Sequence, residues 1–546
     1  MRNRRVKCDE SKPQCKRCQR YGTLCGGYSL PREKNIPLQR TTITAKILPK
    51  DQRQIPKLPE VLPICTIHSG LRFDDDKESR CFRIYCEETA VCITGPFTSS
   101  LWETLIPQTS EMEPFVRKAA VAVGALAKLS KDKKKSSRTV FLSSNDPDTT
   151  YALQKYDEAL RGMRRAILRR DHDVRKMLIA CLLVFCFETL QGNFLSAISH
   201  AERGLMLFIQ AMSDPSICRP SPAPSAATKA VERNMLEGDL MHAYAGLDLH
   251  IMYFRDTRSE EMHRALIVHQ NRQILQMPTT IEDTKEARKY WFLIMRRNYH
   301  FLKIASKDAA KNAPQTSLES DESPLDDSYP AMECVMSSPG RPSLDFQDEY
   351  ESYTEDMRRC SRACSRLYER IRQNGTQAQK LLIDILNVHT KITNIVLTGL
   401  FFSSELEYDS FLPDFRKMVS LAKVVHPQLL ASAEGSAGFH YGYGINYPLF
   451  LVGLKCRDKG LRDEAIKLLG SREHREGTWD AMALASIAGW VRDVEQKCLG
   501  PDGFVVETQR VFLTGCNLDL QSRTTTVKAA QRTEAGLAFR KAFIKW

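Results

Sequence analysis

The chain has 546 residues, of which 42% are hydrophobic and 27% are charged. At roughly 100–200 residues per domain, this length predicts about two to four domains and excludes a small secreted module stapled by disulfide bonds. The mean hydropathy is negative, which argues against a polytopic membrane protein. The net charge of +13 is the unusual quantity.

The positive charge is concentrated at the start of the chain. Residues 1–60 hold 15 Lys and Arg against five Asp and Glu, a net charge of +10, whereas the other 486 residues carry only +3. A basic head on a nearly neutral body is expected of a nucleic-acid-binding arm, although a polybasic membrane anchor or a solvated tail has the same charge pattern.

The lack of a recognisable targeting segment and the pattern of cysteines both indicate an intracellular protein. No apolar segment follows the basic N-terminus, so a secretory signal is not expected. The longest apolar run, Met177–Phe187, is shorter than the ~20 residues that span a bilayer and is expected to be a buried helix. Most of the 17 cysteines stand alone in apolar surroundings, as reduced thiols do.

One group of cysteines, in residues 1–28, has a meaningful spacing. Cys8, Cys15, Cys18 and Cys25 form the pattern C-x6-C-x2-C-x6-C among many Lys and Arg residues. Two thiolates at a C-x2-C spacing can reach one tetrahedral Zn²⁺, and neighbouring bases favour the thiolate form. Structural disulfides are the alternative, but they are not expected in an intracellular chain.

The motifs around these cysteines carry a family resemblance. The segments are R-x-R-R-V-K-C-D from Arg2, K-P-x-C-x-R-C from Lys12 and C-x-G-Y from Cys25. They resemble the fungal Zn2Cys6 binuclear cluster transcription factors. That resemblance implies six thiolates around two zinc ions, with the four cysteines present here at the third to sixth positions.

The first two cysteines of the family pattern are missing, and the second would fall at Met1. Methionine is a poor zinc ligand, so the binuclear cluster cannot close as the sequence is written. Three explanations compete: a start site assigned too late, an isoform with an impaired head, or a single zinc ion held by all four cysteines. The first is favoured because the basic segment is intact, and at most one Zn²⁺ is expected with the four cysteines present.

The resemblance also implies roles for the basic residues of the head. Arg4 and Arg5 match the positions that read base edges at CGG-type half-sites, where a guanidinium donates two hydrogen bonds to guanine. The other bases are expected to neutralise DNA phosphates; they are Lys7, Lys12, Lys16, Arg17 and Arg20. A role in nuclear import alone is the simpler alternative.

Residues 29–63 are expected to form a linker, because they contain six prolines and no sustained helical period. No leucine heptads follow the head, so the sequence does not decide between monomer and dimer.

The body that follows is expected to be helical. Apolar residues recur at spacings of three and four in residues 153–167, and the pattern predicts an inward face; its members are Leu153, Tyr156, Leu160, Met163 and Ile167. The run from Met177 to Leu190, the break at Gly192 and Asn193, and the segment Phe194–Gln210 predict a helix hairpin. Further helices are expected at Lys285–Ser306, Tyr350–Asn374, Gln379–Leu400 and Arg462–Leu469.

No run with the two-residue period of strands is recognised, so the fold class is predicted to be all-α. Exposed loops are expected at Ser130–Thr150 and Ser213–Ala227. A disordered, acidic insert is expected at about residues 307–347. The predicted domains are therefore a partial zinc cluster at 1–28, the linker at 29–63, a helical domain at 64–500 and a C-terminal segment at 501–546.

The body also resembles the helical regulatory domain of many zinc-cluster factors, most clearly at Asp173–Gly192 and Tyr441–Asp458. Four aromatic residues in the second segment are candidates for a small-molecule pocket, although core packing is the favoured interpretation. They are Tyr441, Tyr443, Tyr447 and Phe450.

No signature of a catalytic site is present: G-x-S-x-G, H-E-x-x-H, the Walker loop and G-x-G-x-x-G are all missing. We therefore expect a nuclear, non-enzymatic regulator of RNA polymerase II genes that binds double-stranded DNA and Zn²⁺. The transcription machinery and a second copy of the chain are further expected partners, and a membrane is not. The alternative is a helical interaction protein that has lost its DNA-binding head.

Overall fold

The computed structural model describes residues 73–95, 99–135, 146–169, 173–213, 228–254, 256–312, 331–332, 340–433, 438–497, 504–534 and 536–546. The chain divides into two units, Met1–Ile64 and Cys65–Trp546, and every described residue belongs to the second. The predictions for the basic head and for the linker at 29–63 concern residues outside this description.

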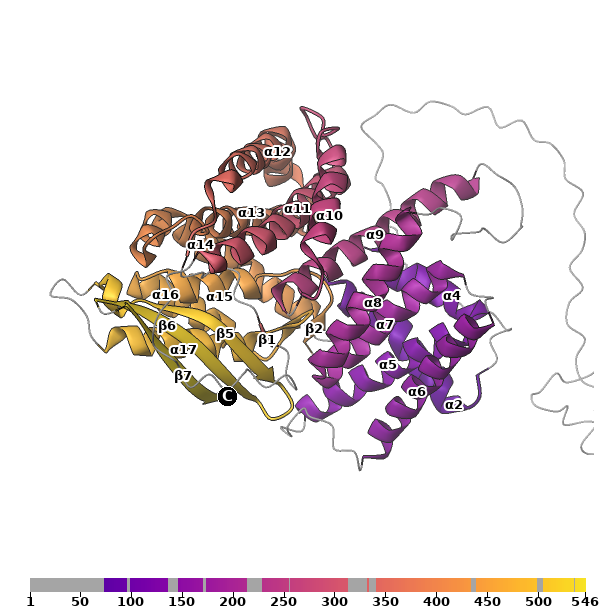
Figure 1. Ribbon diagram of the computed structural model, residues 1–546. Coiled ribbons are helices and arrows are strands. Elements are labelled where there is room, and N and C mark those ends of the chain that lie inside the picture. Colours follow the sequence, from indigo (N-terminus) through magenta and orange to yellow (C-terminus); the bar gives the residue numbers. More distant parts are fainter. Residues whose placement is uncertain are drawn as a thin grey trace, which may run out of the picture. The chain divides into compact units, whose positions relative to one another are not determined.

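The first part of the second unit is a set of packed helices (Figure 1, indigo to magenta). Two of its turns are π-helical, Tyr85–Thr89 and Leu101–Leu105. The helices are α2 (Asp76–Ile84), α3 (Ala90–Thr94), α4 (Ile106–Met112), α5 (Pro114–Lys135), α6 (Pro147–Leu168), α7 (Val174–Gln191), α8 (Phe194–Ser213) and α9 (Thr228–Tyr253).

The predicted helix hairpin is formed by α7 and α8. The side chain of Asp173 accepts a hydrogen bond from the backbone N–H of Arg175 and caps the start of α7. Gly192 ends that helix with a φ of 79°, a left-handed conformation that glycine adopts without steric cost. The apolar run from Met177 to Phe187 lies within α7 and is almost entirely buried, so this prediction is confirmed.

The predicted inward face of α6 is wrong in part. Tyr156 and Met163 are buried as expected, but Leu153 and Ile167 are 37% and 50% exposed. The buried stripe is instead shifted toward Ala152 and Ala159, which have no exposed surface beyond 1%. Small side chains let α6 approach α5 closely, so helix spacing rather than side-chain hydrophobicity sets the orientation of this helix.

The second part of the unit contains further helices. They are α10 (Glu260–Ile274), α11 (Thr284–Lys311), α12 (Gln347–Asn374), α13 (Gln377–Gly399), α14 (Leu412–Ser432), α15 (Asn446–Lys455), α16 (Lys459–Leu469) and α17 (Ala481–Gln496). The four predicted from the sequence in this part correspond to α11, α12, α13 and α16. Among the described residues, short 3₁₀ helices lie at Leu344–Phe346 and Glu405–Phe411, between the helices of this part, and at Glu507–Gln509, after α17. The all-α prediction is confirmed for the body, which is predominantly helical.

Within the described ranges, α13 is long and apolar enough to cross a membrane by length and composition. Most of its apolar window is buried inside the protein, and Ile385, Ile392 and Val396 belong to the core. Core packing therefore accounts for the apolar character of α13.

The expected loops and insert coincide only partly with described residues. Within Ser130–Thr150, α5 continues to Lys135 and α6 begins at Pro147. Within 307–347, α11 continues to Lys311 and a short strand, β1, occupies Ala331–Met332. At the end of the insert, Leu344–Phe346 forms a 3₁₀ helix and α12 begins at Gln347, so the expectation of disorder is wrong at both ends of this segment. Residues 136–145, 214–227, 313–330 and 333–339 lie outside the described residues.

The expectation that the chain contains no strands is wrong at the C-terminus. Strands β5 (Val511–Asp519), β6 (Thr524–Thr533) and β7 (Gly536–Lys545) form an antiparallel meander, and β1 pairs with the free side of β5. Figure 1 shows this sheet in yellow beside α17, and all three long strands contact that helix. Val511, Phe512 and Leu513 are consecutive and buried, so β5 lacks the alternation that identifies a half-buried strand.

A smaller sheet joins two hydrophobic cores. Strands β2 (Phe439–His440) and β3 (Arg475–Glu476) run parallel, and β4 (Trp479–Asp480) pairs antiparallel with β3. Phe439 and Tyr441 belong to the core of the N-terminal helices, whereas Tyr443 and Tyr447 belong to the core built by α10–α17 and the C-terminal sheet. The segment after β2 therefore passes from one core to the other.

Candidate functional site

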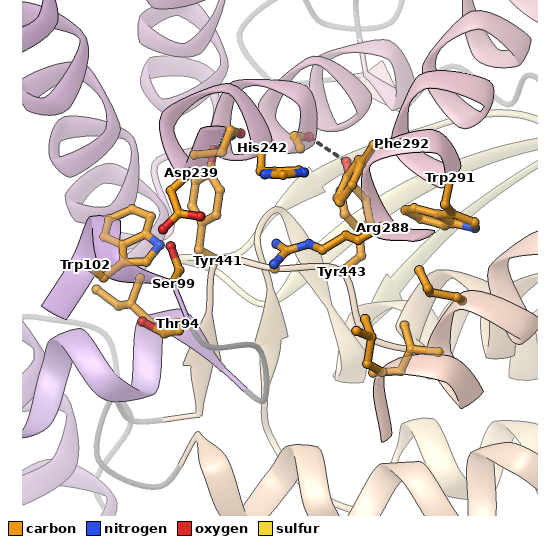
Figure 2. Close-up of a pocket in the computed structure, with 17 residues that line it drawn as sticks. Thr94, Ser99, Trp102, Asp239, His242, Arg288, Trp291, Phe292, Tyr441 and Tyr443 are labelled. Atoms are coloured by element: carbon orange, nitrogen blue, oxygen red, sulfur yellow. Dashed lines mark hydrogen bonds between the residues drawn. The ribbon is translucent and has the colours of Figure 1, made fainter. Parts of the chain in front are cut away.

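A cavity of about 50 Å³ lies where the segment after β2 meets α3, α9, α11 and α13 (Figure 2). A single water molecule needs about 10–15 Å³ on this scale, so the cavity has room for several waters. The lining residues are Ile93, Thr94, Ser99, Trp102, Asp239, His242, Ala243, Gly246, Arg288, Trp291, Phe292, Leu382, Ile385, Leu386, Tyr441, Gly442 and Tyr443.

Two tyrosines form one wall of the cavity and are held there by α9. The hydroxyl of Tyr441 donates to the carbonyl of Ala243 at 2.7 Å, and that of Tyr443 donates to the carbonyl of Gly246 at 2.6 Å. The ring of Tyr441 lies 5.0 Å from that of Trp102, centroid to centroid. Because both hydroxyl protons are already donated to the helix, these side chains present mainly ring surface to the cavity.

An acidic group lies on the α9 wall. Asp239 accepts hydrogen bonds from the backbone N–H and the hydroxyl of Ser100, at 2.7 and 2.6 Å, and both end on Oδ2. These bonds tie α9 to the residue that precedes the π-helical turn Leu101–Leu105, and so they also fix the position of Trp102 at the cavity.

A basic group enters from α11. Figure 2 shows Arg288 reaching into the space between His242 and Tyr443, with Asp239 and Trp102 beyond its guanidinium. Burial lowers the pKa of Arg288, and the negative charge of Asp239 opposes that shift. A guanidinium stays protonated in proteins, so the cavity holds one positive and one negative charge at neutral pH.

His242 is the third titratable group of the cavity. Burial and the positive charge of Arg288 lower its pKa to about 4, against the opposing effect of Asp239. The imidazole is therefore neutral at pH 7 and adds no charge to the cavity.

The four aromatic residues considered from the sequence have different positions. All four are buried, in agreement with the favoured core interpretation, but Tyr441 and Tyr443 also line the cavity. Tyr447 and Phe450 lie in the core only, where the ring of Tyr447 packs 4.4 Å from that of Tyr253. Core packing is therefore confirmed for all four residues, and a small-molecule pocket at Tyr441 and Tyr443 stays a prediction.

The predicted metal and DNA-contacting residues lie outside the described residues. They are Cys8, Cys15, Cys18 and Cys25 for the metal, Arg4 and Arg5 for bases, and Lys7, Lys12, Lys16, Arg17 and Arg20 for phosphates. In the part of the chain that the structure describes, no three His, Cys, Asp or Glu side chains are grouped as metal ligands. Assignment of the head therefore depends on comparison with known proteins.

Residues 2–35 match the fungal Zn(2)-Cys(6) binuclear cluster domain. The chain is also similar to the aspercryptin biosynthesis cluster-specific transcription regulator atnN of Emericella nidulans, with 30% identity over 219 residues, 38% of this chain and 33% of that protein. A second relative, the transcription regulator lscL of Purpureocillium lilacinum, is 25% identical over 222 residues, 40% of this chain and 49% of that protein. The resemblance to the fungal zinc-cluster transcription factors is confirmed.

The matched domain is defined by zinc ions held by cysteines, so Zn²⁺ is confirmed as the metal of the zinc-cluster segment. The matches span less than two thirds of the length of either curated relative. No solved structure is significantly similar to the chain.

Sequence reasoning missed the polar and tryptophan residues of the cavity in the helical body. Asp239 and His242 are three residues apart on α9, as are Arg288 and Trp291 on α11, and such pairs share a helix face. The signal that could have indicated the cavity is a charged residue one helical turn from an aromatic or imidazole side chain, on the inward face of a helix. The convergence of the two faces is not visible in either helix alone.

Proposed function

We propose that this protein is a sequence-specific DNA-binding transcription regulator of the fungal zinc-cluster type. The match of residues 2–35 to the Zn(2)-Cys(6) domain is the observation that carries the proposal. The similarity to two curated relatives, each named as a transcription regulator, supports it. The concentration of basic residues in the first 60 positions agrees with an arm that binds a polyanion.

The cysteines of the head suit zinc chemistry. Four thiolates complete a tetrahedral coordination shell for one Zn²⁺ ion, and the basic residues around them stabilise the deprotonated sulfur. The metal, when bound, supplies the folding free energy that a segment this small cannot obtain from a hydrophobic core. We propose Cys8, Cys15, Cys18 and Cys25 as the ligands that this chain provides.

The basic residues divide into two roles in this proposal. Arg4 and Arg5 each donate two hydrogen bonds to guanine O6 and N7 at a CGG-like half-site in the major groove. The remaining bases neutralise phosphates and give affinity that falls with salt but does not depend on base sequence; they are Lys7, Lys12, Lys16, Arg17 and Arg20. A nuclear location, RNA polymerase II target genes, contacts to the transcription machinery and homodimerisation belong to the same proposal.

The test measures zinc content and DNA affinity of the full chain. We expect bound zinc, and tighter binding to a duplex containing CGG than to one with the triplet scrambled. Arg5→Ala should weaken the binding free energy by about 1–3 kcal/mol on the CGG duplex only, because base readout is lost. Lys16→Ala should weaken both duplexes equally and reduce the slope of log affinity against log salt by about 1. Lys46→Ala, which removes the same charge outside the matched residues, is the control.

A chain without bound zinc that binds both duplexes equally at every salt concentration would contradict the proposal. The helical interaction protein without DNA recognition would then be the better description of this chain.

A further inference from the structure

A cleft of about 230 Å³ lies between α8, the last turn of α9 and the segment that leads into α10. Its floor is apolar: Leu205 and Ile251 are each 1% exposed, and the side chains of Met206 and Met262 complete the apolar surface. A cavity of about 150 Å³ holds a benzene molecule. The volume of this α8–α10 cleft therefore suits a single ring that carries a short chain.

One carboxylate of the cleft has no cationic partner. Glu202 of α8 accepts a hydrogen bond from the hydroxyl of Thr257 at 3.4 Å, and no basic side chain of the described chain forms an ion pair with it. Burial and the negative charge of Asp256 raise the pKa of Glu202, against the opposing effects of Thr257 and Arg258. The protein therefore compensates the charge of Glu202 only in part.

Arg258 also lines the cleft, but its guanidinium is engaged elsewhere. Nε and Nη2 donate to Asp256 at 2.8 and 2.7 Å, and Nη1 donates to Asp248 at 2.5 Å. Asp248 accepts two further hydrogen bonds from Arg296, at 2.9 and 2.7 Å. Glu202 thus adds a third carboxylate to a group with two guanidinium groups, which leaves one negative charge in excess beside the cleft.

The histidines that contact this charged group do not offset the excess. Nε2 of His300 lies 3.2 Å from Oδ2 of Asp248, and Nε2 of His263 lies 3.6 Å from Oδ2 of Asp256. Burial lowers the pKa of His263 to about 3 and also lowers the pKa of His300. Both imidazoles are therefore neutral at pH 7.

The excess charge and the apolar floor decide the class of ligand. An organic anion would meet carboxylates without a free cation. An uncharged molecule would displace water from Glu202 without supplying a counter-charge, which is costly. An inorganic cation would find too few ligands, since no three His, Cys, Asp or Glu side chains in the described part of the chain are placed to hold a metal.

We propose that the α8–α10 cleft binds a primary amine that carries an aromatic ring on a short chain. The ammonium group, protonated at pH 7 like that of lysine, donates hydrogen bonds to the carboxylate of Glu202. The ring packs against Met206, Ile251 and Met262, and methionine side chains adapt readily to rings of different shape. The inference goes beyond DNA binding and does not depend on it, because ligand binding is measured on the protein without DNA.

The first experiment varies the charge on one hydrocarbon frame. Titration calorimetry measures the binding of 2-phenylethylamine, 2-phenylethanol and 3-phenylpropanoate to the full chain at pH 7. 2-Phenylethanol has the same number of heavy atoms as the amine but no charge. We expect the amine to bind about tenfold more tightly than this alcohol, because a charge-assisted hydrogen bond is stronger than a neutral one. The anion 3-phenylpropanoate should bind most weakly.

The second experiment locates the ligand through carbon-13 methyl resonances of methionine. The peaks of Met206 and Met262, assigned with Met206→Leu and Met262→Leu, should shift when 2-phenylethylamine is added. The peak of Met112, which is 77% exposed on α4, should not shift.

The third experiment separates the charge from the shape of the cleft. Glu202→Gln keeps an acceptor for Thr257 but removes the charge, so it should reduce the affinity for the amine to that for the alcohol and leave the alcohol unchanged. A merely structural role of Glu202 would weaken both ligands. Met206→Trp fills the cleft and should weaken both. Glu355→Gln and Met112→Trp are the matched controls, because both side chains are exposed on helices outside the cleft, and they should leave both affinities unchanged.

Unfolding temperatures without ligand verify that the variants are folded, and the comparison of ligands on the natural chain needs no variant. The proposal is overturned if 2-phenylethylamine does not bind at millimolar concentration, if it binds no more tightly than 2-phenylethanol, or if the peaks of Met206 and Met262 do not shift. n-Butylamine ends like a lysine side chain and should bind more weakly than 2-phenylethylamine. Equal or tighter binding of n-butylamine would assign the cleft to a lysine of a partner protein and would also overturn the proposal.

Discussion

Glu476 is a buried carboxyl group at the junction of the two cores. It lies in β3 with 2% exposure, and its carboxylate accepts hydrogen bonds from the backbone N–H groups of Ile445 and Asn446, at 2.9 and 2.8 Å. Asn446 begins α15, so Glu476 satisfies donors that the helix itself cannot pair. Burial raises the pKa of Glu476 to about 7, although these backbone donors oppose the shift. The same contacts anchor the segment that carries Tyr441 and Tyr443.

This raised pKa predicts a pH-dependent contribution to stability. The native pKa is about 7 and the ordinary value is 4.5, so between these values the native state binds more protons than the unfolded state. The contribution of Glu476 is present below pH 4.5 and is lost as the pH rises through 7. Relative to Glu476→Gln, the free energy of unfolding of the natural chain should fall by at most about 3 kcal/mol over this window. Urea unfolding followed by circular dichroism from pH 4.5 to 8 measures it.

Glu369→Gln, on the exposed side of α12, is the control for this prediction and should show no such trend. Buried histidines away from Glu476, such as His250, whose pKa burial lowers to about 3, act in the opposite direction but cancel in the difference between variants. His440, whose Nε2 lies 3.8 Å from Oε1 of Glu476, is the exception, so His440→Gln is combined with each variant to remove its contribution. Equal pH trends for the two variants would contradict the role given to Glu476.

At the scale of elements, small residues set how closely the N-terminal helices pack. A Cβ atom added at Gly124 of α5 would lie 2.4 Å from the backbone oxygen of Cys81 in α2, and one at Gly162 of α6 would lie 2.7 Å from Cβ of Phe115. Such contacts are possible only because glycine has no side chain. They also explain why the buried stripe of α6 runs through alanines instead of through Leu153 and Ile167.

Gly124→Ala should therefore destabilise the protein, by about 1–3 kcal/mol, because the backbone of α2 cannot move away without disturbing its packing. Gly489→Ala in α17 is the matched substitution, since no atom lies within 4 Å of the added Cβ. It should raise stability by up to about 1 kcal/mol through helix propensity. Thermal unfolding of the two variants beside the natural chain measures both effects, and a shift of the same sign in both would refute the packing argument.

At the scale of the whole helical body, buried ion pairs fasten the C-terminal sheet to the helices. Glu495 of α17 accepts hydrogen bonds from Arg457 at 2.9 Å, from Arg462 at 2.6 Å and from the backbone N–H of Val511 in β5 at 2.7 Å. Burial alone would raise the pKa of Glu495, but Arg457 and Arg462 lower it overall. Glu405 provides a second carboxylate to Arg457 at 3.1 Å. The carboxylate of Glu495 thus connects α17 with Arg462 of α16 and with β5.

Glu495→Gln should destabilise the protein by about 3–5 kcal/mol, because it leaves two buried guanidinium groups with too few carboxylates. Glu464→Gln removes a carboxylate of the half-exposed pair with Lys423 on the outer side of α16 and should cost less than about 1 kcal/mol. Chemical unfolding monitored by far-ultraviolet circular dichroism compares the two. Similar losses for both variants would show that the Glu495 network does not hold the sheet in place.

Local patterns predicted the parts of this protein whose cause is local. Periodic apolar residues predicted α7, α8, α11, α12, α13 and α16, and Gly192 predicted the end of α7 because glycine alone adopts that backbone geometry freely. The cysteine spacing and the basic motifs of residues 1–28 predicted the zinc-cluster resemblance, which the match of residues 2–35 bears out. Strand β5 was missed because a strand buried on both faces has no two-residue period.

The amino-acid sequence by itself determined the helical character of the body and the zinc-binding character of the head, since both follow from residues that lie close together in the sequence. Only the tertiary structure decided which residues share the cavity. Trp102, Asp239, Arg288 and Tyr441 come from four separate segments, and no spacing relates them. Their meeting depends on how the two cores close against each other, a free-energy balance over the whole body that no local pattern contains.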